Sequence, residues 1–484
     1  MIALNIDPAD FEYDTGSLIK EFFPDEDISV NGTGKHSGKN PRFRLDIAIS
    51  GEDIKALFVS GDGTRKNRSV NVAGKNRLQT KNALKRLVYD IFSKETGKEL
   101  AWGTLTGIRP VNLALTMTGG GLGRDEIKGR LRDDYLVSEK KAELCVSIAG
   151  RQEKILSGFD LKNSFSLYID IPFCPSRCLY CSFTSNPISS FSSRLDDYLD
   201  ALFKELSAVR DVIGERKICS IYIGGGTPTA LDEKRLERLL SFVGDSFDVT
   251  DLSEFCVEAG RPDSLSKGKL DIMREHGVSR ISINPQTMNE RTLKVIGRNH
   301  TPEDVLRAFE LARAEGFSNI NADIIAGLPG ESADDFLNTL SEIERIHPES
   351  LTVHSFARKR AAEFNIRRDE YAALKTENSD SLMDAACESA GRMGMSPYYL
   401  YRQKNMAGNL ENTGYSRPGL ESIYNIVMME NRQHIAGAGP GASSKIVFCD
   451  GRKAERLVNP KNVDIYIQRI DEIVKKKREF LSTI

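Results

Sequence analysis

The stretch Ile171-Pro-Phe-Cys174-Pro-Ser-Arg-Cys178-Leu-Tyr-Cys181 places three cysteines in a C-x3-C-x2-C spacing. Four thiolates saturate a [4Fe–4S] cluster in simple electron-transfer proteins, whereas three closely spaced thiolates leave one iron open for a small chelating ligand. An open iron supports chemistry as well as electron storage. The spacing therefore predicts a [4Fe–4S] cluster held by Cys174, Cys178 and Cys181.

Zinc is the alternative metal for closely spaced thiols. Structural zinc sites take four protein ligands, usually as two separated pairs, and no second pair or H-x3-H partner follows here. The remaining cysteines stand singly along the chain at Cys145, Cys219, Cys256, Cys387 and Cys449. Single cysteines of this kind are typical of buried thiols in a reducing compartment, and they argue against a disulfide framework.

Length and composition set the outer limits. The chain has 484 residues, of which 40% are hydrophobic and 28% charged, and its formal net charge is −2. The length predicts about three domains of roughly 150 residues each. The first residues lack a basic start, and no run reaches the roughly 18 apolar residues of a membrane span. We therefore expect a cytoplasmic protein with no membrane partner.

From about residue 166 to residue 356, short strand-like runs alternate with longer helical patterns. The runs are nearly continuous in apolar residues, as parallel strands buried on both faces should be. Right-handed crossovers wind such units into a partial barrel, with the reactive loops at the carboxyl ends of the strands. The six predicted strands are Leu167–Ile171, Ser220–Ile223, Glu254–Glu258, Arg280–Asn284, Asn319–Ile325 and Ser350–His354. The predicted helices include Leu195–Val212, Glu233–Phe242, Thr301–Arg313 and Ser332–Ile346.

The predicted fold class is therefore α/β, with a partial (β/α)6 barrel, an N-terminal α+β domain and a C-terminal α/β extension. We place the domains at residues 1–160, 161–360 and 361–484, and the role of the first stays open. In the last domain, Ala436-Gly-Ala-Gly-Pro-Gly-Ala442 is interpreted as a loop of small residues. The tail Ile470–Leu481 is interpreted as a charged surface helix.

A basic run marks the N-terminal domain. Between residues 65 and 86 the chain carries no acidic residue and eight cationic ones, which are Arg65, Lys66, Arg68, Lys75, Arg77, Lys81, Lys85 and Arg86. Such a run is typical of a solvated face, and it is also compatible with a polyanion or a carboxylate-rich substrate.

The second predicted strand leads straight into Gly224-Gly-Gly226-Thr227-Pro228. Without side chains the backbone can approach a ligand closely and present its polar groups at the strand end. Alone, a glycine-rich turn after a strand is weak evidence. Together with the three-cysteine loop one strand earlier, it resembles the radical S-adenosylmethionine superfamily.

That resemblance implies a mechanism. The amino acid part of S-adenosylmethionine chelates the open iron, and an electron from the cluster cleaves the sulfonium to give methionine and a 5′-deoxyadenosyl radical. The radical removes hydrogen from an unactivated carbon. The protein orients the reactants, excludes water and protects the radical.

Further segments resemble the oxygen-independent coproporphyrinogen III oxidase family. They are Leu167-Tyr-Ile-Asp-Ile-Pro-Phe-Cys174, Gly224-Gly-Gly-Thr-Pro-Thr229, Phe255-Cys-Val-Glu-Ala259, Arg280-Ile-Ser-Ile-Asn-Pro-Gln286 and Asp323-Ile-Ile-Ala-Gly-Leu-Pro-Gly330. The long N-terminal extension and Tyr398-Tyr-Leu-Tyr-Arg-Gln-Lys-Asn405 are similar to the HemZ-type coproporphyrinogen dehydrogenase subgroup. The resemblance covers the whole chain, and it is strongest over residues 166–357.

The resemblance also implies site residues for one or two molecules of S-adenosyl-L-methionine. The cluster-bound molecule is expected to meet Tyr168, Tyr180, Gly225 and Glu258. A second molecule is expected to meet Gly226, Thr227, Gln286, Arg298, Asp323 and Ala357. These residue types suit the ligand, because carboxylates accept from an ammonium or from ribose hydroxyls and a guanidinium can hold a carboxylate.

The implied reaction is oxidative decarboxylation of two propionates of coproporphyrinogen III to vinyls, giving protoporphyrinogen IX in anaerobic haem and porphyrin biosynthesis. The implied partners are this or a related tetrapyrrole and a reduced flavodoxin- or ferredoxin-type electron donor. A nucleic acid partner is not expected. A radical enzyme that modifies RNA, using the basic run, stays as an alternative.

Two positions depart from the family pattern. Where well-studied members carry a fourth cysteine, this chain has Phe183, and where a histidine is common it has Asp170. The related haem-chaperone branch also carries phenylalanine at the first position, so a haem-binding protein is a further alternative. That branch usually shows a His-Asn-x-x-Tyr-Trp signature, whereas the corresponding segment here is Asn409-Leu-Glu-Asn-Thr-Gly-Tyr415. This difference favours the oxidase interpretation.

Overall fold

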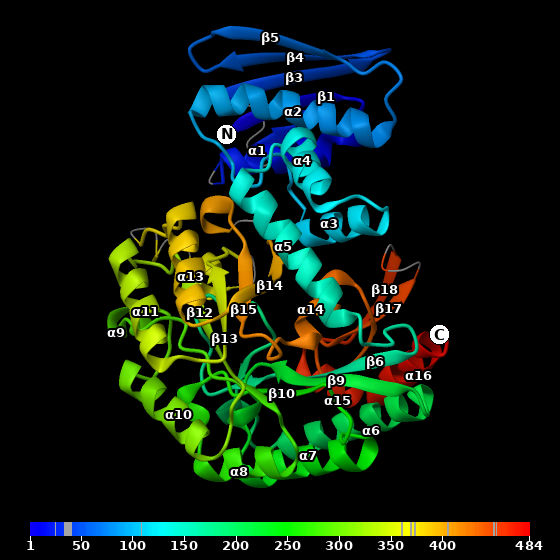
Figure 1. The fold of residues 1–484 in the computed structure, drawn as a ribbon, viewed down its shortest axis with the longest axis vertical. Coiled ribbons are helices and arrows are strands. Elements are labelled where there is room, and N and C mark those ends of the chain that lie inside the picture. The colour runs from blue at the N-terminus through cyan, green and yellow to red at the C-terminus, as the bar shows by residue number, and fades with distance from the viewer. Residues whose placement is uncertain are drawn as a thin grey trace. The chain divides into compact units, whose positions relative to one another are not determined.

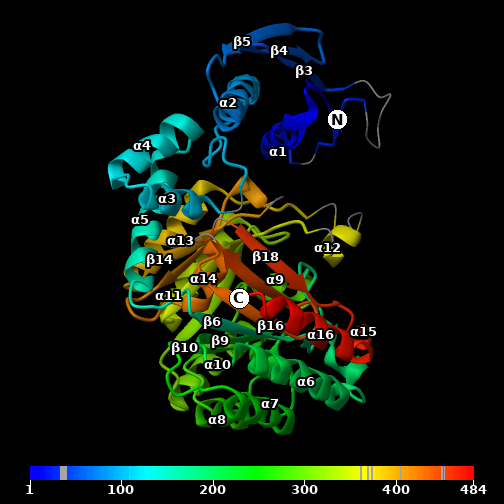
Figure 2. The same ribbon diagram turned by 90° about the vertical axis from the view of Figure 1, so that its right-hand side faces the viewer.

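A computed structural model describes residues 1–24, 26–32, 41–107, 109–359, 362–367, 370–371, 374–403, 406–448, 451 and 453–484. The chain divides into two compact units (Figures 1 and 2). The first comprises Met1–Ser147 and Arg402–Asn405, and the second comprises Ile148–Tyr401 and Met406–Ile484. In this division the segment after residue 360, apart from Arg402–Asn405, belongs to the same unit as the predicted barrel strands. The three-domain division stays a prediction.

The first unit is a sheet with helices on one face. Its five strands lie in the order β2-β1-β3-β4-β5. Apolar and polar residues alternate along the strands, so that one face contributes Leu4, Leu45 and Phe58 to a core shared with α1 and α2 (Figure 2). The strands are β1 Ile2–Asp7, β2 Ile28–Val30, β3 Phe43–Ser50, β4 Asp53–Ser60 and β5 Arg65–Asn71. The helices are α1 Glu12–Phe22, α2 Arg77–Thr96, α3 Pro110–Gly119, α4 Arg124–Tyr135 and the start of α5 Glu139–Leu156.

The basic run lies on β5 and α2 of this unit, where several of its cations have acidic partners. Lys66 pairs with Glu95 at 2.8 Å, Arg68 with Asp90 at 3.7 Å, Arg77 with Asp10 at 3.6 Å and Lys81 with Asp14 at 3.7 Å. Lys85 is buried, and burial lowers the pKa of its ammonium to about 8. Ion pairs within the unit thus compensate much of this charge, as on a solvated protein face.

The second unit is built on one large open sheet. Its eleven strands lie in the order β14-β15-β13-β12-β11-β10-β9-β6-β16-β17-β18. The six predicted strands form its centre and pair in parallel in the predicted sequence. They are β6 Ser164–Ile171, β9 Lys217–Gly225, β10 Glu254–Glu258, β11 Arg280–Ser282, β12 Ile320–Ala326 and β13 Ser350–Ser355. The prediction of six βα units is confirmed.

Helices follow these strands and lie along the outer face of the sheet (Figure 1). The crossover helices are α6 Leu195–Ile213, α7 Glu233–Ser246, α8 Lys267–Glu275, α9 Glu290–Val295, α10 Pro302–Ala314 and α11 Ala333–Ile346. The start of α11 shows why the sequence begins a helix at this point. The side chain of Ser332 accepts from the N–H of Asp335, and the Asp335 carboxylate accepts from the N–H of Ser332, so that two helix-end donors are satisfied together.

The predicted loop at Ala436–Ala442 is wrong in its first half. Residues His434–Ala438 form strand β16, which pairs in parallel with β6. The small residues are needed for close packing, because a Cβ on Gly439 would lie 2.4 Å from the carbonyl oxygen of Asp170. The small apolar residues at the start of this run therefore form part of a buried strand, β16. This strand lies beside β6, which leads to the cysteines.

The tail helix α16, Ile470–Leu481, is present as predicted, but it also carries a buried charge. Lys477 is fully buried and donates to the carbonyl oxygen of Gly437 at 2.6 Å. It pairs with the buried carboxylate of Glu205 at 3.1 Å, and Glu205 in turn accepts from the N–H of Gly439 at 2.9 Å. This network fixes β16 between α6 and α16.

The C-terminal segment completes both edges of the sheet. Strand β15 pairs antiparallel with β13 at one end, and β16 to β18 extend the other end beyond β6. The remaining elements are β7 Phe173–Cys174, β8 Asn186–Pro187, α12 Glu363–Ile366, α13 Asp380–Arg392, β14 Ser396–Tyr401, β15 Asn412–Ser416, α14 Ile423–Glu430, β17 Ser443–Phe448, β18 Lys453–Val458 and α15 Val463–Gln468. Among the described helices, none is both long and apolar enough to cross a membrane.

Candidate functional site

The three cysteines lie on the loop after β6, at the carboxyl end of the parallel strands. Cys174 ends the short strand β7. The N–H of Cys181 donates to the carbonyl oxygen of Cys178 at 3.1 Å, and the N–H of Leu179 donates to the carbonyl oxygen of Ile296 at 2.9 Å. Cys178 is buried, whereas Cys174 and Cys181 are half-buried. The backbone thus holds the loop against the end of α9.

Within the described parts of the chain, no three His, Cys, Asp or Glu side chains converge as the ligands of one metal ion. A [4Fe–4S] cluster takes each thiolate on a different iron, so its ligands need not converge on one point. The donor set is sulfur alone, which iron–sulfur clusters prefer.

Charge around the loop supports the same fit. Burial raises the pKa of the Cys181 thiol to about 11, and the neighbouring Cys178 adds to that rise. Burial also raises the pKa of Cys174. Such thiols ionise when a metal supplies positive charge, and two buried guanidiniums, those of Arg261 and Arg298, lie beside Cys178. The residues present therefore fit a three-thiolate cluster.

The glycine turn after β9 lies directly on the cysteine strand. The N–H of Gly226 donates to the carbonyl oxygen of Ile171 at 2.8 Å, and the N–H of Thr227 donates to that of Phe173 at 2.7 Å. The Thr227 hydroxyl lies 3.3 Å from the sulfur of Cys174. Gly225 has φ +99°, and a Cβ there would lie 2.4 Å from Oδ1 of Asp170. Glycine is needed here because both the backbone conformation and the space exclude a side chain.

Two predicted carboxylates lie on strands of the sheet, Glu258 at the end of β10 and Asp323 in the middle of β12, and they differ in charge state. Burial raises the pKa of Glu258 to about 7, although the Tyr222 hydroxyl that donates to it opposes the rise. Burial would also raise the pKa of Asp323, but the hydrogen bond from His354 holds it below its ordinary value. Asp323 therefore stays ionised at neutral pH, whereas Glu258 is close to half-protonated.

Asp170, which replaces the common histidine, belongs to the same region. It is buried, and its pKa is raised well above the ordinary value by burial and further by the nearby charge of Glu258. Its Oδ2 accepts from the hydroxyl of Tyr168 at 3.3 Å, while its Oδ1 has no hydrogen-bond partner among the described residues. The structure thus adds Asp170, a buried carboxyl with a raised pKa, to the predicted Tyr168 and Glu258.

A stack of three tyrosines lies against these carboxyls. Each ring lies near the other two: the centroid of Tyr424 is 5.9 Å from that of Tyr168 and 4.6 Å from that of Tyr222, and the centroids of Tyr168 and Tyr222 are 6.3 Å apart. Only Tyr168 was predicted. Tyr424 starts α14 in the C-terminal segment, far along the chain, and no local motif marks it. Tyr222 lies on β9 within a nearly continuous buried run, and its hydroxyl between Ile221 and Ile223, just before the glycine turn, is the signal that could have found it.

The residues predicted to bind a second S-adenosylmethionine molecule fall into separate groups, and each group makes its own contacts. Arg298 donates from Nη2 to the Tyr180 hydroxyl at 3.2 Å, and from Nη1 to the carbonyl oxygens of Gly260 and Asn284. Gln286 has φ +68°, and its N–H donates to the carbonyl oxygen of Asp323 at 2.9 Å. Ala357 forms a β-bridge with Met406, which is not a predicted site residue. The structure therefore links Tyr180 to Arg298 and Gln286 to Asp323, and it places Ala357 in neither pair.

The position without the fourth cysteine is open. Phe183 is 64% exposed, and the ammonium of Lys359 lies 5.1 Å from the centroid of its ring. Lys359 also interacts with Cys181, although burial lowers its pKa. Phe183 cannot ligate iron, so the loop supplies three thiolates only.

Site occupancy should depend on pH through Glu258. The predicted contact of Glu258 with the ammonium of S-adenosylmethionine needs an ionised carboxylate, so we expect the affinity for this compound to rise about tenfold from pH 6 to pH 7.5, as Glu258 loses its proton near pH 7. The groups that face Glu258 are Tyr222, Tyr168, Tyr424, Asp170 and Asp323. Equilibrium binding at each pH measures the effect.

A Glu258→Gln variant should bind more weakly and lose this dependence. The matched control is Glu388→Gln on the exposed face of α13, which should keep the wild-type profile. Equal pH profiles for wild type and Glu258→Gln would show that another group controls binding.

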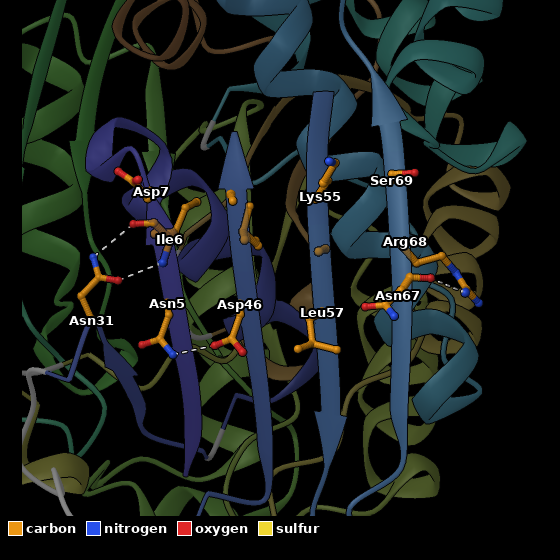
Figure 3. A pocket seen from close by; sticks show the side chains of 13 residues that line it. Asn5, Ile6, Asp7, Asn31, Asp46, Lys55, Leu57, Asn67, Arg68 and Ser69 are labelled. Atoms are coloured by element: carbon orange, nitrogen blue, oxygen red, sulfur yellow. Dashed lines mark hydrogen bonds between the residues drawn. The ribbon is translucent and has the colours of Figure 1, made fainter. Parts of the chain in front are cut away.

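A separate pocket of about 600 Å³ lies within the first unit, on the sheet face opposite α1 and α2 (Figure 3). Its polar lining includes Asn5, Asp46, Lys55 and Asn67, with Asn5 donating to Asp46 at 2.6 Å. None of the residues predicted for the cluster or for S-adenosylmethionine lines it. The pocket is therefore not part of the predicted cofactor site.

Comparison with known proteins supports the fold and the superfamily. The model of the radical SAM superfamily matches residues 168–343. The solved structure of the coproporphyrinogen III oxidase HemN from Escherichia coli aligns with a TM-score of 0.52 at 23% identity, over 67% of this chain and 73% of that one. At that identity the match establishes the fold alone, and the predicted fold class is confirmed.

Curated relatives extend the comparison to the rest of the chain. The oxygen-independent coproporphyrinogen-III oxidase-like protein HemZ of Bacillus subtilis is 40% identical over 93% of this chain and 92% of its own length. The haem chaperone HemW of the same organism is 33% identical over 63% of this chain and 76% of its own length. The match to HemZ therefore includes the N-terminal region as well as the barrel.

Proposed function

Since the chain belongs to the radical SAM family of oxygen-independent coproporphyrinogen-III oxidase-like proteins, we propose that it converts two propionates of coproporphyrinogen III into vinyls. Each vinyl forms as the propionate loses one hydrogen atom, carbon dioxide and one electron, which passes to a one-electron acceptor. The product is protoporphyrinogen IX. A flavodoxin- or ferredoxin-type protein is the proposed source of electrons for the cluster.

The observation that carries this proposal is the extent of the similarity to HemZ. That similarity runs over nearly the whole chain, whereas the similarity to HemW covers under two thirds of it. Both branches share the barrel, so the barrel alone does not separate an oxidase from a haem carrier. The N-terminal region favours the oxidase, because it is shared with the oxidase-like relative.

The proposed cofactor contacts follow from the side chains. Cys174, Cys178 and Cys181 would hold the cluster, and the turn at Gly225 and Gly226 would let the backbone approach S-adenosylmethionine. When bound, these cofactors supply the one-electron chemistry that removes hydrogen from an unactivated carbon.

The acidic and aromatic groups would orient the ligand. Glu258 and Asp323 accept hydrogen bonds from cationic or hydroxyl groups, and the stacked rings of Tyr168 and Tyr424 exclude water from that side. The raised pKa of Asp170 favours its protonated form, which can donate a hydrogen bond where an ionised carboxylate could only accept one. This arrangement supports a dry site that binds a cationic sulfonium compound.

An anaerobic product assay tests the proposal. Reconstituted protein is incubated with coproporphyrinogen III, S-adenosylmethionine and dithionite, and porphyrins and 5′-deoxyadenosine are measured by chromatography. We expect vinyl porphyrin, with one 5′-deoxyadenosine formed per propionate. Tight haem binding without turnover would instead support a haem carrier. Salt-dependent RNA binding, lost when Lys81 and Arg86 are neutralised, would support the RNA-modifying alternative.

A further inference from the structure

Arg261 is a buried cation that no motif singled out. It follows β10, only 2% of it is exposed, and its side chain reaches the cysteine loop. Its Nη1 donates to the hydroxyl of Ser176 at 3.2 Å and lies 3.7 Å from the sulfur of Cys178. The other side of the guanidinium is held by Asp263, through Nε at 2.9 Å and Nη2 at 2.8 Å. Arg261 therefore has a fixed position beside one proposed cluster ligand.

Ser176 of the cysteine loop makes a second hydrogen bond in addition to the one from Arg261. The Ser176 hydroxyl that accepts from Arg261 donates to the carbonyl oxygen of Gly297 at 3.1 Å. Gly297 lies next to Arg298, the second buried guanidinium. Arg298 donates to the carbonyl oxygens of Gly260 and Asn284 and to the Tyr180 hydroxyl, and it also interacts with Cys178, so none of these partners is a carboxylate. Its charge is thus not compensated by a hydrogen-bonded carboxylate among the described residues.

The charges around Cys178 sum to a positive environment. Arg261 and Arg298 each carry one positive charge, and Asp263 carries one negative charge because its bond to Arg261 holds its pKa low against the effect of burial. His300 lies in the same group, but burial lowers its pKa to about 4, so it is neutral near pH 7. Before the thiolates are counted, the net charge is therefore one positive unit.

A fixed positive charge favours the reduced form of a cluster. Reduction adds one electron to the iron–sulfur core, and a nearby cation in a low-dielectric interior stabilises the added charge. Hydrogen bonds to the ligand sulfurs act in the same direction. Both effects are strongest for buried groups, and Arg261 is among the most buried large side chains of the second unit.

We propose that Arg261, positioned by Asp263, raises the reduction potential of the cluster and so sets how readily an electron donor reduces it. Arg261 acts through Cys178 and is a positioning residue. The inference rests on the proposed function only for the presence of the cluster, and it requires neither the tetrapyrrole nor turnover.

The test uses variants of the full-length protein, reconstituted anaerobically, with the midpoint potential followed by electron paramagnetic resonance. Arg261→Met removes the cation, and its potential should shift to more negative values. Asp263→Asn removes the compensating anion, and its potential should shift to more positive values. Arg261→Lys keeps the charge and should lie between Arg261→Met and wild type. Arg345→Gln, on the exposed face of α11, is the matched control and should not shift.

Opposite shifts for Arg261→Met and Asp263→Asn support the proposal, because general damage to the loop would move both potentials the same way. Equal potentials, or shifts of the same sign, overturn it. If Arg261→Met fails to load iron, Asp263→Asn decides alone, and an unchanged or more negative potential overturns the proposal. A wild-type protein that binds no cluster would contradict the proposed function, whereas a wild-type protein that holds a cluster without forming vinyls leaves this result standing.

Discussion

A Cys178→Ser variant is expected to lose its iron–sulfur cluster and, with it, the S-adenosylmethionine cleavage that we propose. Cys178 is the buried member of the three-cysteine loop and lies beside both Arg261 and Arg298. A serine hydroxyl is too weakly acidic to ligate iron at neutral pH, and two thiolates do not hold the cluster firmly. Because the ligands act as a unit, formation of 5′-deoxyadenosine should fall at least about 1,000-fold.

Iron and sulfide contents of the anaerobically purified protein measure the loss directly. Cys387→Ser is the matched control. Cys387 is an exposed cysteine on α13, which is distant in sequence from β6 and from the cysteine loop that follows it. It should keep the iron content and the activity of the wild type. A Cys178→Ser protein with full iron, and with a spectral response to S-adenosylmethionine, would refute the three-thiolate site.

The parallel strands were predictable because their sequence signal is physical. Strands buried on both faces require nearly continuous apolar runs, and segments such as Phe255–Val257 on β10 carry that pattern without interruption. The cysteine loop was placed correctly at the end of β6 for the same reason, since the topology brings all carboxyl ends to one edge. In this part of the chain, the local apolar pattern and the order of the strands in the sheet predict the same structure.

Strand β16 was not predictable from the same signal. Three of its five residues, Ala436, Gly437 and Ala438, are small, and small residues are typical of loops as well as of strands that must pack closely. What makes it a strand lies elsewhere in the chain. Glu205 and Lys477 bond to its backbone from α6 and α16, and no local pattern at residue 436 reports those partners.

The residues of the candidate site also divide into those that the sequence predicts and those that only the fold reveals. Glu258 ends β10 and Asp323 lies within β12, both inside sequence segments that carry the resemblance, so the resemblance could assign them. Arg261 looks like an ordinary surface cation in sequence, and only the fold shows that it is buried against Cys178. Tyr424 comes from a helix that no motif connects to the barrel, and its stacking on Tyr168 depends on the whole chain being folded.

A Gly226→Ala variant is expected to weaken both the stability of the second unit and its affinity for S-adenosylmethionine. A Cβ on Gly226 would lie 2.4 Å from the carbonyl oxygen of Phe173 and 2.8 Å from that of Ile171. These atoms belong to the backbone that leads to Cys174, so no side chain can rotate away to make room. We expect a loss of about 1–3 kcal/mol in the free energy of unfolding of the apo protein, as for other overpacked positions.

The effect on binding follows from the same contact. To accommodate the methyl group, the turn must move away from the cysteine strand, and the hydrogen bond from the Gly226 N–H to Ile171 lengthens from 2.8 Å. Thr227, whose hydroxyl lies 3.3 Å from the sulfur of Cys174, moves with it. Since one turn carries both the cluster strand and the proposed cofactor contact, iron loading and S-adenosylmethionine affinity should fall together.

Gly244→Ala is the matched control for this substitution. Gly244 lies inside α7, where a Cβ would meet no atom within 4 Å. Alanine is the better helix former, so this variant should be neutral or more stable by about 0.5–1 kcal/mol, with unchanged iron content. Urea unfolding of the apo proteins and equilibrium binding of the reconstituted ones measure the two effects. Wild-type stability and affinity in Gly226→Ala would mean that the turn does not touch the cysteine strand as the structure shows, because backbone atoms 2.4 Å from a new methyl group leave no other way to absorb it.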